Sequence, residues 1–146
     1  MRKATPSSAR LRPRPGDVIS YAFLWPDQAE AGRDDGVKDR PCVVVLAVGE
    51  GDNPLVTVAP ITSRPPDEED AIPLSAGALG LTRQSWIIPN ALNLFRWPGP
   101  DLRPAGAPAG AWWRWGTLAP ELRNRLADRI RARLALREGR LIRRTE

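Results

Sequence analysis

Apolar residues in the first two thirds of the chain gather in short runs separated by turn-forming residues. Residues 42–48 form a continuous apolar run rich in valine, which is typical of a strand buried on both faces. Clusters of Gly, Pro, Asp and Asn on both sides of such runs mark where strands end. On this basis, strands are predicted at residues 18–24, 42–48, 55–61, 71–74, 86–88 and 92–97.

The spacing of the apolar positions changes near the C-terminus. A proline at position 120 suits the first turn of a helix, and Gly139 is expected to end that helix. Many short strands followed by one helix predict a mainly β fold with one C-terminal α-helix, as in a small barrel closed or capped by that helix. The helix is predicted from apolar residues at every fourth position: Leu122, Leu126, Ile130 and Leu134.

Composition narrows the range of functions. The 146 residues suit one domain, and the absence of histidine excludes imidazole catalysis and zinc fingers. One cysteine cannot form an internal disulfide. The acidic run at 67–70 is interpreted as a solvated loop, and neither a metal nor another cofactor is expected. No apolar run is long enough for a membrane helix or a secretory signal, so we expect a cytoplasmic protein with no membrane partner.

The charge is unevenly distributed. The net charge of +5 comes from the two ends, because residues 16–120 contain more acidic than basic side chains. Residues 1–14 are predicted to be a disordered basic arm, residues 15–137 the folded domain, and residues 138–146 a basic tail. Most of the cations are arginine, which binds phosphate through two parallel hydrogen bonds. A GC-rich genome would also favour arginine.

Candidate chemistry lies at strand ends. Arg40 precedes a buried strand, and Thr62, Ser63 and Arg64 follow another. Arginine and hydroxyl groups at the rim of a rigid β structure are suited to binding phosphate. A purely structural interpretation is also open, in which Arg40 pairs with Asp39 and the two hydroxyl residues make a turn.

Six tryptophans are many for this length. Single-stranded RNA is bound by aromatic side chains that stack on bases beside basic groups. Trp25 with Arg33, and the stretch 112–115, are therefore candidates for RNA binding. Tryptophans that belong to the core or to a subunit interface are the alternative.

Several motifs, in order, resemble the MazF/PemK toxins of bacterial toxin–antitoxin pairs, in particular the PemK-like branch. The similarity covers about residues 15–136. It rests on Gly-Asp-Val at 16–18, Arg-Pro-Cys-Val-Val-Val at 40–45, Val-Ala-Pro-Ile-Thr-Ser at 58–63, Ala-Ile-Pro-Leu at 71–74, Leu-Gly-Leu at 79–81, Trp-Pro-Gly-Pro-Asp-Leu-Arg-Pro at 97–104 and Gly-Thr-Leu-Ala-Pro at 116–120.

The resemblance implies an SH3-like small barrel, a homodimer, and cleavage of single-stranded RNA without metal, neutralised by a cognate antitoxin. It places the principal catalytic roles on Arg40 and Thr62, with Ser63 beside them. In the implied reaction, the 2′-hydroxyl of the RNA attacks its own phosphate and expels the 5′-oxygen. A guanidinium and hydroxyl donors can stabilise the charge that develops on the phosphate.

The chain departs from the family pattern at two places. Many relatives have a glutamate five residues before the arginine. Here Asp35 stands in that position and Glu30 lies in the same loop, so the general base is either of these or another acid. Where relatives have Asp-Gln-x-Arg, this chain has Asn90 and Asn93, which can hydrogen-bond a base but cannot accept a proton in catalysis. The alternative is therefore a catalytically silent module on the same barrel that binds nucleic acid or protein, as the CcdB-type gyrase inhibitors do.

Overall fold

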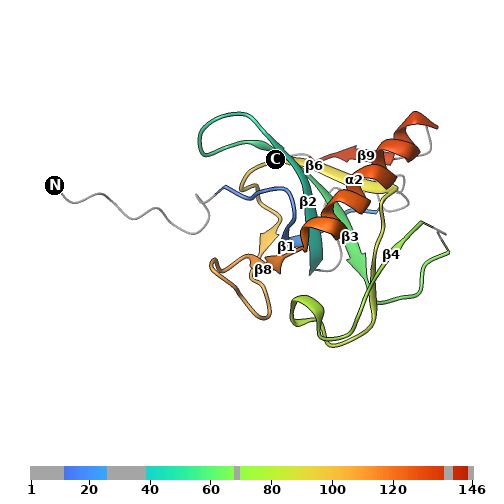
Figure 1. Ribbon diagram of the computed structural model, residues 1–146. Helices are drawn as coiled ribbons and strands as arrows, with labels where there is room; N and C mark the ends of the chain where they lie inside the picture. The colour runs from blue at the N-terminus through green and yellow to red at the C-terminus, as the bar shows by residue number, and fades with distance from the viewer. Residues whose placement is uncertain (1–11, 26–38, 68–69, 137–139, 145–146) are drawn as a thin grey trace.

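The computed structural model describes residues 12–25, 39–67, 70–136 and 140–144. In these residues, nine strands form a curled half-barrel sheet, and the helix α2 (Pro120–Ala135) crosses one face of it over β2 and β3 (Figure 1). A short 3₁₀ turn, η2 (Ala78–Gly80), lies between β4 and β5. The strands are β1 (Asp17–Ala22), β2 (Asp39–Val48), β3 (Leu55–Thr62), β4 (Ile72–Leu74), β5 (Ser85–Ile87), β6 (Ala91–Arg96), β7 (Leu102–Arg103), β8 (Arg114–Thr117) and β9 (Arg140–Arg143).

β3 pairs with three other strands of the sheet. Its residues 55–60 pair antiparallel with β2, its residues 55–58 also pair with β6, and its last two residues pair with β5. β2 pairs on its other side with β1, which in turn meets β7 and β8. All other strand pairs of the sheet are antiparallel, whereas β9 runs parallel to β6.

The sheet buries both of its faces. On one face an aromatic core includes Tyr21 stacked on Phe95, and Trp97 edge-on to Trp113. On the other face Leu126 and Ile130 of α2 pack with side chains such as Val43. Successive residues of a strand point to opposite faces, so two buried faces require a strand with no polar alternation. This is why the central part of β2 reads as a continuous apolar run.

The predicted fold class is confirmed, and the main strands lie close to the predicted positions. Three strands were not predicted: β7, β8 and β9. The helix ends at Ala135 with Leu136 as its C-cap, rather than at Gly139, and no helix in the described ranges is both long and apolar enough to cross a membrane.

The basic tail is the clearest difference from prediction. Residues 140–143 form β9 on the edge of β6, and Arg144 is only 5% exposed. Arg144 donates to the Asp101 carboxylate at 2.6 Å and to the Ala22 carbonyl at 2.9 Å. Residues 140–144, which were predicted as part of a basic tail outside the folded domain, therefore join the sheet and its contacts. A run of only four residues carries little strand signal of its own, and its order comes from contacts with distant parts of the chain.

Candidate RNA-binding groove

The candidate site lies where β2 and β3 separate. Cys42 lies opposite Pro60 in the ladder that joins them. Beyond this pair the last two residues of β3 turn to β5, while the start of β2 stays with β1. The separation leaves Arg40 on one wall and Thr62 on the other.

Pro41 helps to explain why the ladder stops there. Its partner on β1 is Ser20, whose backbone N–H donates to the Trp113 carbonyl at 2.8 Å, away from β2. Backbone groups in an antiparallel ladder alternate sides, so the backbone edge of Pro41 faces β3. Proline has no N–H to donate, and the ladder therefore loses a hydrogen bond at the point where the groove opens.

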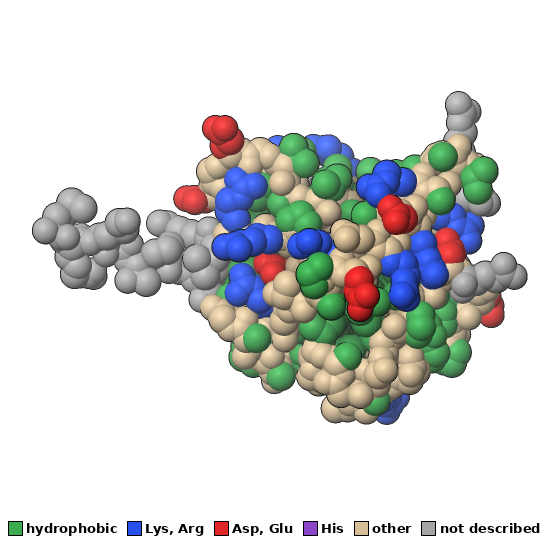
Figure 2. Space-filling model, in the orientation of Figure 1, with side chains coloured by type: hydrophobic (Ala, Val, Ile, Leu, Met, Phe, Trp, Pro, Cys, Tyr) green, Lys and Arg blue, Asp and Glu red, His purple; other side chains and the backbone are tan. Residues whose placement is uncertain are grey.

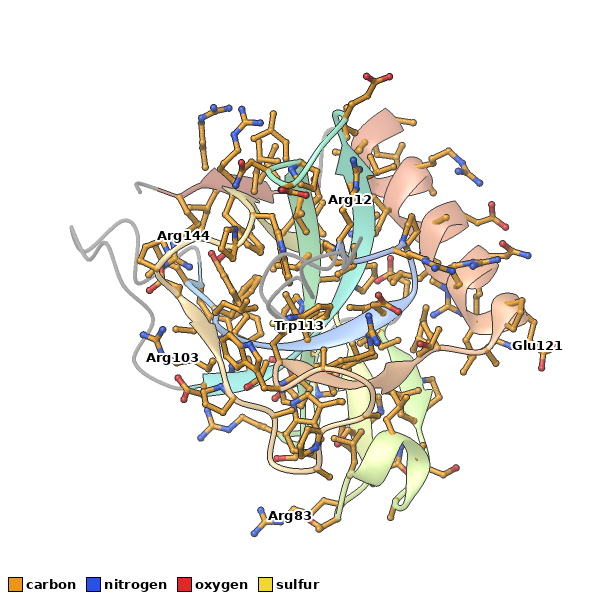
Figure 3. The ribbon with its side chains drawn as sticks, turned by 90° about the vertical axis from the view of Figure 1, so that its left-hand side faces the viewer. Arg12, Arg83, Arg103, Trp113, Glu121 and Arg144 are labelled. Carbon is orange, nitrogen blue, oxygen red and sulfur yellow. The ribbon has the colours of Figure 1, made fainter. Side chains whose placement is uncertain are left out.

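The groove has a volume of about 1160 Å³. Asp39, Arg83 and Trp115 contribute to its lining, and Figure 3 shows Arg83 projecting at one end of the molecule. Arg83 was not predicted from the sequence, whereas Trp115 belongs to the stretch 112–115 that was proposed as a candidate for RNA binding. The groove brings together five of the predicted site residues: Trp25, Arg40, Thr62, Ser63 and Arg64.

Arg40 is half-buried on the groove wall. Its guanidinium carbon lies 5.1 Å from the centre of the Trp25 ring, a cation–π arrangement that fixes its position. Burial lowers the pKa of Arg40, because desolvation disfavours the charged form. Its Nε has no hydrogen-bond partner among the described residues. Asp39, which the structural interpretation paired with Arg40, instead lies 3.4 Å from Arg103.

Thr62 and its neighbours form a turn that leaves polar groups at the rim. The Thr62 hydroxyl accepts a hydrogen bond from the Arg64 backbone N–H at 3.1 Å, as the turn interpretation predicts. The hydroxyl proton of Thr62 stays free to donate, since accepting uses only the oxygen. The Ser63 and Arg64 side chains are exposed beside it. A structural turn and a phosphate-facing donor are therefore compatible at the same residue.

Asn93 does not face the groove. It is fully buried, and its amide bonds the backbone of Leu24 in both directions, accepting from the N–H and donating to the carbonyl at 2.9 Å. Its oxygen also accepts from Arg144 at 3.0 Å. The prediction that Asn93 contacts RNA is therefore wrong, and its side chain instead belongs to the core. Asn90, half-buried before β6, is not among the residues that line the groove.

Of the candidate tryptophans, Trp25 and Trp115 line the groove, whereas Trp112 and Trp113 do not. The Trp115 indole nitrogen is buried and has no hydrogen-bond partner in the described part of the chain. Buried indole N–H groups are usually paired, so the unpaired donor of Trp115 is an exception at the groove wall. Trp113, by contrast, is fully buried in the aromatic core (Figure 3). The alternative of a core role therefore holds for Trp113.

Some predicted residues lie outside the described part. Glu30, Arg33 and Asp35 belong to residues 26–38, so their positions relative to the groove stay predictions. Within the described residues, no group of three or more His, Cys, Asp or Glu side chains could hold a metal ion. Asp70, from the acidic run, is bound by Arg133 through both carboxylate oxygens at 2.7 Å.

Comparison of the sequence with protein-family models and with curated proteins finds no match. The chemistry of the site must therefore be inferred from its own residues. A half-buried guanidinium, a hydroxyl donor, exposed arginines and two tryptophan side chains form a surface suited to a phosphodiester beside an aromatic base.

Proposed function

We propose that this chain is a toxin-type endoribonuclease that cleaves single-stranded RNA without metal, as its resemblance to the MazF/PemK toxins implies. The observation that carries the proposal is that Arg40 and Thr62, from two different strands, line one groove where those strands separate. Phosphoryl chemistry of this kind needs positioning and charge stabilisation more than a covalent participant.

In the proposed reaction the RNA 2′-oxygen forms a bond to the adjacent phosphorus, and the bond from phosphorus to the 5′-oxygen breaks. The products are a 2′,3′-cyclic phosphate and a 5′-hydroxyl end. The proton of the 2′-hydroxyl passes to a carboxylate, with Glu30 and Asp35 as the candidates, and the leaving oxygen takes up a proton. Arg40 and Thr62 would stabilise the negative charge on the phosphate oxygens.

Arg40 is assigned to electrostatic stabilisation rather than to proton donation. The pKa of an ordinary arginine lies far above neutral pH, which makes it a poor acid there. Burial lowers the pKa of Arg40, and its side chain lines the groove. Arg64 and Arg83 would contact the backbone on either side, and Trp25 and Trp115 would hold the bases.

The test is cleavage of a mixed-sequence RNA in EDTA. We expect wild-type protein to leave cyclic phosphate ends, and Arg40→Ala to lower the rate at least about 100-fold, the usual scale for loss of one charge-stabilising donor. Arg125→Ala, an exposed arginine of α2 that does not line the groove, is the matched control and should retain full activity. Cleavage that is equal in wild type and Arg40→Ala would overturn the proposal.

The same proposal includes a homodimer and a cognate antitoxin. An acidic segment of the antitoxin would bind the arginine-lined groove and exclude RNA. A purified wild-type protein that binds RNA in EDTA but leaves it intact would fit the alternative, a binding module on this barrel that acts by occupancy.

A further inference from the structure

A second cavity, of about 860 Å³, lies on the other side of β8 from the groove. Trp115 of β8 lines the groove, whereas Arg114 and Thr117 of the same strand line this cavity. Figure 2 shows basic side chains gathered beside the point where the undescribed N-terminal segment begins. Among the residues that the structure describes, the charged groups that line this cavity are four arginines and one aspartate: Arg12, Arg14, Arg114, Arg123 and Asp17.

The single carboxylate is already engaged. Asp17 is 4% exposed and accepts hydrogen bonds from the Arg14 backbone N–H at 2.9 Å and from the Thr117 hydroxyl at 3.1 Å. Arg114 Nε lies 3.6 Å from it, within ion-pair distance. One carboxylate cannot balance four guanidinium groups, so the cavity has an excess of positive charge.

The side chains of Arg12 and Arg114 are held in place by the fold. The Arg12 guanidinium donates to the carbonyls of Gly49 and Gly51. Arg114 lies over the Trp113 ring at 4.7 Å, and its buried Nε has no hydrogen-bond partner in the described residues.

A glycine makes room for the fourth arginine. The Arg123 side chain crosses Gly16, where Cδ would lie 3.1 Å from any Cβ at that position. Gly16 has a φ of +99°, which glycine adopts without strain. Cations held together in this way without enough counter-charge favour binding of an anion.

We infer that this cavity binds backbone phosphates of single-stranded RNA that extends past the groove across β8. The inference rests on the proposed ligand of the groove, but it does not depend on cleavage. Arg12 and Arg83 lie toward opposite ends of the molecule (Figure 3), so a strand that uses both sites must be longer than one that fills the groove alone.

The experiment measures binding of 2′-O-methyl oligonucleotides, which lack the attacking hydroxyl, at lengths of about 4 and 14 nucleotides. The variant is Arg14→Ala with Arg123→Ala, since both side chains are exposed and neither change disturbs the core. Arg125→Ala with Arg131→Ala removes the same charge from exposed positions of α2 that do not line either cavity.

We expect the variant to bind the long oligonucleotide at least about tenfold more weakly and the short one with unchanged affinity. The slope of log affinity against log salt should fall by about 0.7 for each phosphate that the variant no longer neutralises. Equal weakening for both lengths, or the same effect in the control pair, would overturn the inference, because either would reflect general charge alone.

Two further measurements are needed. The first distinguishes a small phosphate ligand from RNA, and the second distinguishes failure of the groove proposal from failure of the inference about this cavity. In the first, inorganic pyrophosphate would bind the wild type to saturation but not the Arg14/Arg123 variant, while the variant binds the long RNA as the wild type does. That result would show that the cavity binds a small phosphate and that the RNA assignment is wrong. Arg40→Ala should weaken binding of both lengths. If it weakens neither, the groove proposal fails, while the length-dependent loss in the Arg14/Arg123 variant still tests this cavity.

Discussion

At the scale of single residues, Arg40 shows how one side chain combines packing and chemistry. Its guanidinium rests against Trp25, while Asp39, its neighbour in sequence, pairs with Arg103. Arg40 is thereby left to a ligand of the groove. Its planar fork matches two phosphate oxygens, which a lysine ammonium cannot do.

Arg40→Lys therefore tests geometry apart from charge. We expect the variant to keep its fold and its positive charge but to cleave RNA about 10- to 100-fold more slowly, because it loses the paired hydrogen bonds. The measurement is single-turnover cleavage with RNA in EDTA, beside circular dichroism. A lysine variant as active as the wild type would show that a point charge is enough.

For Asn93 we predict that substitution lowers the stability of the fold, whereas substitution of Arg40 is predicted to lower the cleavage rate. Replacing Asn93 with alanine leaves the Leu24 N–H and carbonyl unpaired in the core and removes an acceptor from Arg144. We expect the free energy of unfolding to fall by about 3 kcal/mol, since each buried unpaired group costs about 1–3 kcal/mol. Urea unfolding measures this change.

Asn124→Ala, at an exposed position of α2, is the control and should change stability by less than about 0.5 kcal/mol. If Asn93→Ala were stable and only weakened RNA binding, its assignment to the core would be wrong.

These two residues also show how far the sequence allowed the site to be predicted. Arg40 and Thr62 sit at strand ends, where side chains reach a rim whichever face they occupy. Asn93 lies inside β6, opposite Val58, and its direction depends on which of two similar faces is buried. Because both faces of the sheet are buried, the pattern of apolar residues could not decide whether this asparagine points to ligand or to core.

At the scale of elements, α2 is attached to the sheet by an ion pair as well as by its apolar face. Arg133 binds Asp70 through two hydrogen bonds of 2.7 Å. This hydrogen bonding lowers the pKa of Asp70 below its ordinary value of 3.8. A carboxyl with a lowered pKa stabilises the fold above its unfolded-state pKa, and that stabilisation is lost as the pH falls through the folded-state pKa.

Asp70→Asn should therefore lower the free energy of unfolding by about 1 kcal/mol at pH 7, the scale of a well-aligned pair near the surface. The difference from wild type should shrink once the pH falls below 3.8, as the wild-type carboxyl also loses its charge. Urea unfolding at pH 7 and at pH 3 measures both values. A difference that is constant across this range would exclude the ion pair as its cause.

β9 is one of the three strands that sequence reasoning missed, and the reason is physical. Its sequence Arg-Leu-Ile-Arg has only two apolar residues, side by side, and its pairing with β6 spans most of the C-terminal half of the chain. Helix α2, in contrast, has a local repeat that needs no distant contact to be recognised. The helix was predicted to end at Gly139 but ends at Ala135, because Leu136 caps its last turn.

Arg144 should hold β9 in place. Its side chain is 1% exposed and pairs with Asp101, so Arg144→Ala leaves this mostly buried carboxylate with only Arg103, at 3.8 Å. We expect a loss of about 3 kcal/mol in the free energy of unfolding. Asn93→Ala and Arg144→Ala share a hydrogen bond, so their effects in a double variant should be less than additive. Strict additivity would contradict that shared hydrogen bond.

At the scale of the whole molecule, the fold redistributes the charge that the sequence places at its two ends. Arg12 and Arg14 come from the N-terminal segment, and Arg123 from the helix, yet all line one cavity. The sequence predicted two separate basic regions and could not show that they meet, because that requires the first strand and the helix to pack on the same side of β8.

The lack of histidine gives a prediction about the entire pH profile. Ordinary carboxyl groups titrate near pH 4 and arginines far above neutral pH, and the chain has no imidazole between them. We therefore expect the cleavage rate to show no inflection between pH 6 and pH 8. Single-turnover rates in buffers of constant ionic strength measure this. An inflection near pH 6.5 would require a strongly shifted carboxyl or a different mechanism.

β3 has a consequence for how the groove can change. The same eight-residue strand holds the ladder with β2, the ladder with β6 and the wall that bears Thr62. A substitution that moved this wall would also disturb the interior packing. New substrate preferences are therefore expected to arise by changes in the two connecting loops at 63–67 and 80–84, whose variation leaves the scaffold intact.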